Sequence, residues 1–149
     1  MKKILDFIAD EVKKAFEEAG YDGSFAGVTL SNRPDLCEYQ CNGALAAAKT
    51  YKKAPLAIAE DVVARLQDSR ILAAAEAVRP GFINLKLNAV FLGEYLRKMQ
   101  ADQRLSVEPA MNPRKIIIDY GGPNVAKPLH VGHLRSAIIG ESIKRMGRF

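Results

Sequence analysis

The sequence predicts an α+β domain, an antiparallel sheet with helices, over residues 1–101, and the opening strand and helix of a parallel α/β domain over residues 115–149. Helical and strand-like segments are mixed through the first part, and two strand-like segments follow each other across a short turn, as antiparallel strands do. A stretch of mixed polarity with two prolines, residues 102–114, is the predicted linker. A buried-strand pattern, a glycine-containing loop and a helix pattern then form the first half of a βαβ unit.

Four helices are predicted in the first part from the spacing of apolar residues. Between Ile4 and Ala19, apolar side chains recur every three or four residues, and Gly20 supplies a stop. Pro55 separates two later helical patterns, and it suits the first position of a helix because that position needs no backbone N–H. The predicted helices cover residues 2–19, 42–54, 55–69 and 89–102.

Three short segments of the first part are predicted to be strands. The sequence GVTLS, residues 27–31, is followed by a turn at NRPD. The sequences ILAAAEAV and FINLKLN, residues 71–78 and 82–88, are joined by Arg-Pro-Gly, which is short enough for a hairpin. Antiparallel pairing beside several helices gives the α+β class.

Length and composition indicate a globular protein. The 149 residues are 48% hydrophobic and 26% charged, which allows a core and is unlike disordered chains. No apolar run approaches the roughly 18 residues of a membrane span, and acidic residues interrupt the N-terminal pattern, unlike a signal peptide. We therefore expect a cytoplasmic protein without a membrane segment.

The two cysteines, Cys37 and Cys41, are expected to be reduced thiols. In an extended strand their Cα atoms would lie about 13 Å apart, which is beyond disulfide reach. No second Cys or His pair lies nearby in the sequence to complete a zinc site. The sequence therefore predicts no metal bound by the protein.

Positive charge is concentrated at the C-terminal end of the sequence. Residues 1–110 contain 15 Lys and Arg against 15 Asp and Glu, whereas residues 111–149 contain seven against two and hold both histidines. Such a cluster favours phosphates, either of a nucleotide or of a nucleic acid. An ordinary basic surface is the alternative.

The same region has the order of a parallel α/β unit. KIIIDY, residues 115–120, is an apolar run flanked by charge, as in a strand buried on both faces. A helix is predicted from about Val131, with one face formed by Leu134, Ile138, Ile139, Ile143 and Met146. Ligands of such sheets bind where a strand leads through a loop to a helix N-terminus.

The sequence KPLHVGH lies in that position and carries the candidate chemistry. His130 and His133, three residues apart, can point to one side of the first helical turn, and Gly132 lets a base or phosphate approach the backbone. Lys127 can place its charge on phosphate oxygens. Together they could stabilise charge at a phosphorus centre without a protein nucleophile. There are two alternatives for the histidines. They could have a structural role, or they could bind a metal with Asp119 as the one nearby third ligand.

The longer sequence GGPNVAKPLHVGHLRSAIIGE carries a resemblance. Its His-Val-Gly-His matches the His-Ile-Gly-His signature of class I aminoacyl-tRNA synthetases, and the whole stretch is similar to the arginyl-tRNA synthetase version. In the first part, YQCNGALAAAK and RPGFINLKL resemble segments of the N-terminal additional domain of that family. The resemblance implies that residues 115–149 begin a Rossmann-like α/β catalytic domain.

The resemblance also implies ATP-dependent activation of L-arginine and its transfer to tRNA(Arg). ATP, accompanied by Mg²⁺, would then be a substrate, with Lys127, His130 and His133 acting catalytically on its phosphates and Gly132 beneath its adenine. L-arginine would be bound by Asp119, Gly122, Asn124 and His130. Two positions depart from the family pattern, since Asp119 falls where a glutamate is usual and Gly122 where many members have serine.

For the first part, the resemblance implies a surface that contacts the D-loop corner of tRNA. Phe82 and Asn84 match the aromatic and amide positions that touch a D-loop base, which suits stacking and edge recognition of an unpaired base. The alternative is that Phe82 is a core residue and Asn84 a solvent-facing strand residue. The resemblance further implies a monomeric parent protein in the cytoplasm.

Three functions remain open on the sequence alone. The first is an N-terminal fragment of an arginine–tRNA ligase, inactive by itself because a strand and a helix cannot make a parallel sheet. The second is a His-x-Gly-His nucleotidyltransferase without a tRNA-corner domain. The third is a free-standing RNA-binding module.

Overall fold

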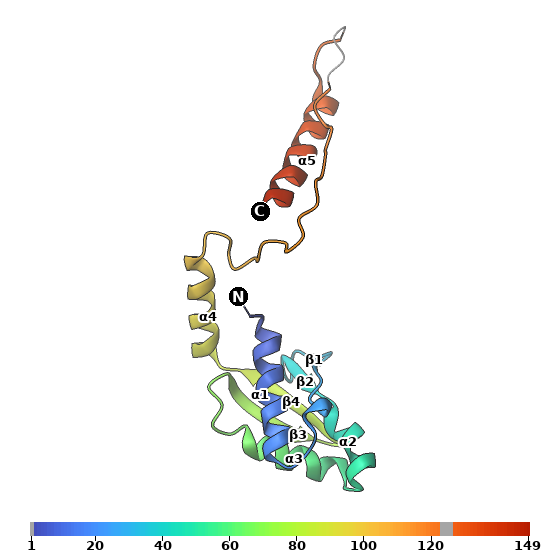
Figure 1. The fold of residues 1–149 in the computed structure, drawn as a ribbon, viewed down its shortest axis with the longest axis vertical. Helices are drawn as coiled ribbons and strands as arrows, with labels where there is room; N and C mark the ends of the chain where they lie inside the picture. The colour runs from blue at the N-terminus through green and yellow to red at the C-terminus, as the bar shows by residue number, and fades with distance from the viewer. Residues whose placement is uncertain (1, 123–126) are drawn as a thin grey trace. The chain divides into compact units, whose positions relative to one another are not determined.

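The computed structural model describes residues 2–122 and 127–149 (Figure 1). The chain divides into two compact units, Met1–Ala101 and Asp102–Phe149. The elements are α1 (Ile4–Glu18), the 3₁₀ helix η1 (Gly23–Phe25), β1 (Val28–Leu30), β2 (Tyr39–Cys41), α2 (Gly43–Tyr51), α3 (Pro55–Arg65), β3 (Leu72–Val78), β4 (Phe82–Leu87), α4 (Ala89–Ala101) and α5 (Val131–Arg148).

The first unit is an antiparallel four-stranded sheet with helices, which confirms the predicted fold class. Its strand order is β1-β2-β4-β3, and each neighbouring pair is antiparallel. The hairpin across Arg-Pro-Gly pairs Val78 with Phe82 and runs to Leu72 opposite Leu87, with an irregularity between Leu72 and Ala74. The four predicted helices and three predicted strands of this unit are present, with ends shifted by a few residues.

One strand of this sheet, β2, was not predicted. It covers only Tyr39–Cys41 and joins β1 to β4, with Gln40 paired to Thr29 on one side and Asn84 on the other. Three residues are too few to show the alternation of polar and apolar side chains that identifies a strand. The strand is therefore defined by its two partners rather than by its own sequence.

The core of the first unit lies between one face of the sheet and helices α1, α2 and α3. Successive strand residues point to opposite faces, so Ile83 and Leu85 of β4 are fully buried while Asn84 between them faces the other way. The largest fully buried side chains are Phe16, Ile8, Ile58, Ile83, Leu85, Val12, Val62, Cys37 and Cys41. Both cysteines are free, as expected from the sequence.

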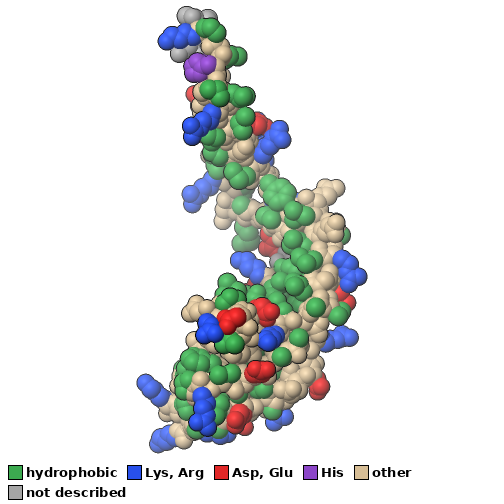
Figure 2. Space-filling view, turned by 180° about the vertical axis from the view of Figure 1, so that it is seen from behind, with side chains coloured by type: hydrophobic (Ala, Val, Ile, Leu, Met, Phe, Trp, Pro, Cys, Tyr) green, Lys and Arg blue, Asp and Glu red, His purple; other side chains and the backbone are tan. Residues whose placement is uncertain are grey.

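The second unit consists of an extended segment and one long helix, α5. The predicted strand at residues 115–120 is not formed as such, because no described residue pairs with it; a strand needs a hydrogen-bonded neighbour. The helix is confirmed, but its predicted apolar face is exposed. Figure 2 shows hydrophobic side chains on the surface of this unit between Lys and Arg side chains, and the exposed apolar residues include Leu134, Ile138, Ile139, Ile143 and Met146.

No helix among the described residues is long and apolar enough to cross a membrane.

Candidate functional site

The N-terminus of α5 is capped by the first of the two histidines. His130 has an extended backbone at the N-cap position, and its Nδ1 accepts a hydrogen bond from the backbone N–H of Gly132 at 3.1 Å. Helix N-termini have free N–H groups that need such acceptors. The sequence thus starts the helix with an imidazole in the place usually taken by Ser, Thr, Asp or Asn.

The second histidine completes a reciprocal pair. The Nδ1 of His133 accepts a hydrogen bond from the backbone N–H of His130 at 3.2 Å, and the two ring centroids lie 4.1 Å apart. An Nδ1 that accepts a hydrogen bond has no proton, so in the neutral ring the proton is on Nε2. Both histidines therefore offer an Nε2–H donor for a ligand beside the positive end of the helix.

Gly132 lies directly against the ring of His130. A Cβ atom on Gly132 would lie 2.9 Å from Cε1 and 3.0 Å from Nδ1 of that ring. A larger residue here would make the imidazole shift from its present position. The glycine thus has a local role in addition to the open approach to the backbone that the sequence predicted.

A cavity of about 780 Å³ lies beside the two histidines. It brings together four of the predicted site residues, namely Gly122, His130, Gly132 and His133. Lys127 and Asp119 are exposed and do not line it, and Asn124 lies outside the described residues. The cavity lining is Tyr120, Gly121, Gly122, Leu129, His130, Val131, Gly132, His133, Leu134, Ser136 and Ala137.

Tyr120 packs the end of the extended segment against α5, a role that the sequence did not suggest. Its ring lies on Gly140, the one buried residue of the helix, where an added Cβ would be only 2.1 Å from Tyr120 Cγ. Its hydroxyl donates a hydrogen bond to Glu141 Oε2 at 2.5 Å. A glycine inside a helix pattern was the available signal, since it commonly marks close packing.

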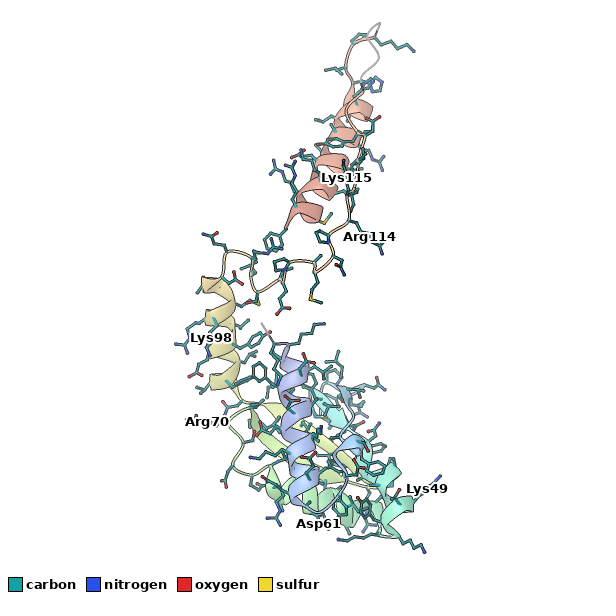
Figure 3. All side chains as sticks on the ribbon, viewed as in Figure 1. Lys49, Asp61, Arg70, Lys98, Arg114 and Lys115 are labelled. Carbon is teal, nitrogen blue, oxygen red and sulfur yellow. The ribbon has the colours of Figure 1, made fainter. Side chains whose placement is uncertain are left out.

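Charged groups surround the Glu141 carboxylate on the same helix. It forms an ion pair with Lys144 and accepts a hydrogen bond from Arg145 Nε at 3.0 Å. The hydrogen bond from Lys144, and then those from Tyr120 and Arg145, lower the pKa of Glu141 to about 2. Two more cations, Arg114 and Lys115, begin the extended segment of this unit (Figure 3).

A second candidate surface lies on the open face of the sheet in the first unit. Phe82 and Asn84 are two residues apart on β4 and point to the same face, opposite to the buried Ile83 and Leu85. Both are half-buried, and neither belongs to the core cluster. The alternative that Phe82 is a core residue is therefore wrong.

Gln40 joins these two residues on the open face. Its Nε2 donates a hydrogen bond to Asn84 Oδ1 at 2.8 Å, across the pairing of β2 with β4. The sequence did not single out Gln40, because β2 is too short to be predicted and Asn84 is 44 positions away along the chain. Pairing of the two strands was needed to find it.

The described residues contain no group of three or more His, Cys, Asp and Glu side chains that could hold a metal ion. His130 and His133 use their Nδ1 atoms for backbone hydrogen bonds. The alternative of a His-x-x-His metal site with Asp119 therefore has no support among these residues.

Comparison with protein families gives two adjoining matches. Residues 2–87 match the arginyl tRNA synthetase N-terminal domain, and residues 96–149 match the catalytic domain of class I (R) tRNA synthetases. The second match includes the His130–His133 pair, and the first includes all four strands of the sheet.

Individual relatives and solved structures agree with these matches. The chain is 56% identical to an arginine–tRNA ligase of Agathobacter rectalis and 51% identical to one of Alkaliphilus oremlandii, in both cases over 100% of this chain and 25% of the relative. It resembles the structure of arginyl-tRNA synthetase from Plasmodium falciparum, with a TM-score of 0.55 and 27% identity over 95% of this chain and 28% of that one. For the Thermus thermophilus enzyme the TM-score is 0.50 and the identity 25%, over 93% of this chain and 22% of that one.

The chain thus spans about a quarter of the length of the curated relatives that it matches. Its two matched segments follow the order of an N-terminal domain and the start of a catalytic domain, and each contains one of the two candidate surfaces. On this evidence, the chain belongs to the arginyl-tRNA synthetase family.

Proposed function

We propose that this chain supplies the ATP-phosphate site and a tRNA-binding surface of an arginine–tRNA ligase. The observation that carries the proposal is the reciprocal His130–His133 pair at the start of α5, which leaves two Nε2–H donors beside a helix N-terminus. The curated relatives are arginine–tRNA ligases, and they match the chain over its whole length.

The reaction requires no nucleophile from the protein. The carboxylate of L-arginine attacks the α-phosphorus of ATP, the bond to the β-phosphate breaks, and arginyl-adenylate and pyrophosphate form. A hydroxyl of the terminal adenosine of tRNA then attacks the arginyl carbonyl, and AMP leaves. Hydrogen-bond donors fixed in advance, such as the two imidazoles, lower the barrier because they stabilise negative charge that develops on the phosphates. Lys127, one exposed cation before the helix, adds its charge to the same groups.

We place the remaining substrate contacts around the same loop. Gly132 and the cavity provide a surface for the adenine, while Asp119, Gly122, Asn124 and His130 are the proposed arginine contacts. Gly122 and His130 line the cavity, which supports their role most directly. Mg²⁺ would be held mainly by the ATP phosphates, as is usual at nucleotide sites.

The open sheet face is the proposed contact with the D-loop corner of tRNA(Arg). Phe82 offers an aromatic surface outside the core, and the Gln40–Asn84 pair offers hydrogen-bonding groups next to it. Unpaired bases are recognised by this combination of stacking and edge hydrogen bonds. We further propose that residues 1–101 bind tRNA, that residues 102–114 are a linker and that residues from 115 onward take part in catalysis. We also propose that the parent protein is monomeric and located in the cytoplasm.

By itself, the 149-residue chain is proposed to lack ligase activity. The segment 115–120 has no partner strand among the described residues, and the apolar face of α5 is exposed. A nucleotide site of a parallel sheet needs neighbouring strands and helices to hold its shape.

ATP binding tests the phosphate site without requiring activity. The test uses the Agathobacter rectalis ligase with its matched quarter replaced by residues 1–149, so that the site has the rest of a ligase around it. Titration of this chimera with ATP, followed by ¹⁵N spectra of the imidazoles, is expected to shift the Nε2 resonances of His130 and His133. His130→Ala with His133→Ala should abolish binding, while Lys98→Ala, on the exposed surface of α4 (Figure 3), should leave it unchanged. Equal ATP affinity of the double variant and the unchanged chimera would contradict the proposed site.

A further inference from the structure

The Gln40–Asn84 hydrogen bond determines which groups the open sheet face presents. Asn84 Oδ1 accepts the hydrogen bond from Gln40 Nε2 at 2.8 Å, so this oxygen and one Gln40 donor are used within the pair. An amide side chain has a carbonyl oxygen on one side and an NH₂ group on the other. With its oxygen held by Gln40, Asn84 presents its NH₂ group away from Gln40, and Gln40 retains its Oε1 as an acceptor.

The sheet holds the two amides in place. Gln40 and Asn84 are direct cross-strand partners in the β2–β4 ladder, and both are half-buried. Thr29 lies next to Gln40 on β1, and Glu76 lies next to Asn84 on β3, so a row of polar residues crosses all four strands. Cross-strand partners have Cβ atoms about 5 Å apart, which restricts the positions of their side chains.

Phe82 lies beside this row on the same face. It is two residues before Asn84, and its cross-strand partner is Val78 of the hairpin. A base stacked on Phe82 would therefore place its edge near the Asn84 amide, since same-face neighbours along a strand are about 7 Å apart. Stacking tolerates every base because each has a flat face, whereas the donor and acceptor at the edge can distinguish bases.

We propose that Gln40 is a specificity-determining residue for an unpaired RNA base, acting by fixing the orientation of the Asn84 amide. This inference rests on the proposed tRNA contact of the open sheet face. The ligand is a single-stranded nucleobase that presents an acceptor to the Asn84 NH₂ group. Gln40 acts as a positioning residue, and its own Oε1 is available as a second contact.

The test uses the 149-residue chain and tRNA(Arg) transcripts. The unpaired D-loop position at which replacement weakens binding most is found first, and four transcripts that carry A, C, G or U at that position are then compared. The dissociation constant of each complex is measured, and the ratio between the weakest and the tightest transcript gives the discrimination. For the unchanged chain, we expect a ratio of about ten or more, as a hydrogen-bonded base edge typically provides.

Two substitutions of Gln40 separate positioning from mere stability. Gln40→Leu frees the Asn84 amide to rotate, so the ratio should fall to about two or less. Gln40→Glu offers only acceptors and draws the Asn84 NH₂ group toward itself, so Asn84 presents its oxygen and the preferred base should change. A structural role alone would weaken all four complexes by the same factor and leave the ratio unchanged. Thr29→Val is the matched control, because Thr29 lies in the same row and makes no described hydrogen bond to Asn84. This variant should keep the discrimination ratio of the unchanged chain.

Each outcome decides one question. If Phe82→Ala and Asn84→Ala bind all transcripts as the unchanged chain does, the tRNA contact of this face is wrong. If these variants weaken binding but Gln40→Leu keeps the discrimination, the contact stands and the role of Gln40 is overturned. An unchanged chain that binds all four transcripts equally also overturns that role.

Discussion

The two units of the chain differ in how they bury their apolar residues. In the first unit, Ile8, Phe16, Ile58 and their neighbours are fully buried between three helices and a sheet. In the second unit, α5 has one buried residue, Gly140, and Ile138 is 57% exposed. The first unit therefore has a core of its own, whereas the second is held by local contacts between α5 and the segment before it.

The difference concerns function as well as stability. The proposed RNA surface lies on a sheet whose shape is maintained by its own core, and the proposed phosphate site lies at the end of a helix whose apolar face is uncovered. We therefore expect RNA binding to survive in this chain and ligase activity to be absent from it.

Removal of a core side chain should affect the first unit strongly. Phe16→Ala is expected to lower the free energy of unfolding by about 3–5 kcal/mol, because it removes a fully buried aromatic side chain and leaves a cavity. Ile138→Ala on α5 should change it by less than about 0.5 kcal/mol, as exposed substitutions do. Urea unfolding followed by circular dichroism measures both, and similar effects of the two substitutions would show that α5 shares a core with other parts of the chain.

Gly140→Ala should release the extended segment from α5. The added Cβ would lie 2.1–2.6 Å from Tyr120 atoms, so the ring must move away, at a cost of about 1–3 kcal/mol from overpacking. The helix itself should persist because alanine favours it. Loss of nuclear Overhauser effects between Tyr120 and α5 is the expected signal. Gly147→Ala, where the new Cβ meets nothing within 4 Å, should preserve them, and their retention in Gly140→Ala would contradict the described packing.

Removal of the His130 cap should loosen the start of α5 modestly. His130→Ala removes the acceptor for the Gly132 N–H, which should cost about 1 kcal/mol of local stability, whereas His130→Asn can restore a cap. Faster amide hydrogen exchange at Gly132 in the alanine variant, and near-normal exchange in the asparagine variant, would agree with this. Unchanged exchange in His130→Ala would mean that the imidazole does not cap the helix.

The packing of Tyr120 on α5 should also depend on pH. The pKa of Glu141 is lowered to about 2 by Lys144, Tyr120 and Arg145, so its ionised form is favoured in the folded unit. A lowered carboxyl pKa gives stabilisation that is complete above the ordinary value of about 4.3 and is lost as the pH falls toward 2.

Carboxyl ¹³C shifts of Glu141 are the measurement. The midpoint is expected near pH 2 in the unchanged chain and nearer the ordinary value in Lys144→Ala. A midpoint near 4.3 in the unchanged chain would contradict the ion pair.

The sequence predicts elements whose pattern is local and long enough to read. The helices around Ile8 and Ile58 follow from apolar spacing, and the hairpin follows from Arg-Pro-Gly between two strand patterns. The strand β2 could not be predicted, because its three residues are extended only through pairing with β1 and β4. The strand at 115–120 was predicted from an apolar run flanked by charge, but no described residue pairs with it, and pairing does not follow from a local pattern.

The candidate site shows the same limit. His130, Gly132 and His133 are close in sequence, so their proximity at the helix start was predictable from spacing alone. Gln40 with Asn84, and Tyr120 with Gly140, are brought together by strand pairing and by packing on a helix. A glycine within the helix pattern marks Gly140, but neither pair can be read from a local pattern, since each joins two segments that are distant along the chain.

The proposed ligase function is tested most directly by grafting. The Agathobacter rectalis ligase is 56% identical to this chain over the matched quarter of its length, so that quarter can be replaced by residues 1–149. Arginine-dependent exchange of pyrophosphate into ATP is then measured for the chimera and for the chimera with His130→Ala and His133→Ala. We expect the chimera to exchange pyrophosphate at a rate near that of the intact ligase. The chimera with both histidines replaced should be at least a hundredfold slower, because it has lost preorganised stabilisation of charge on the phosphates. Equal rates of exchange for the chimera and its double variant would contradict the proposed ligase function. So would the absence of exchange in a chimera that is folded and binds tRNA.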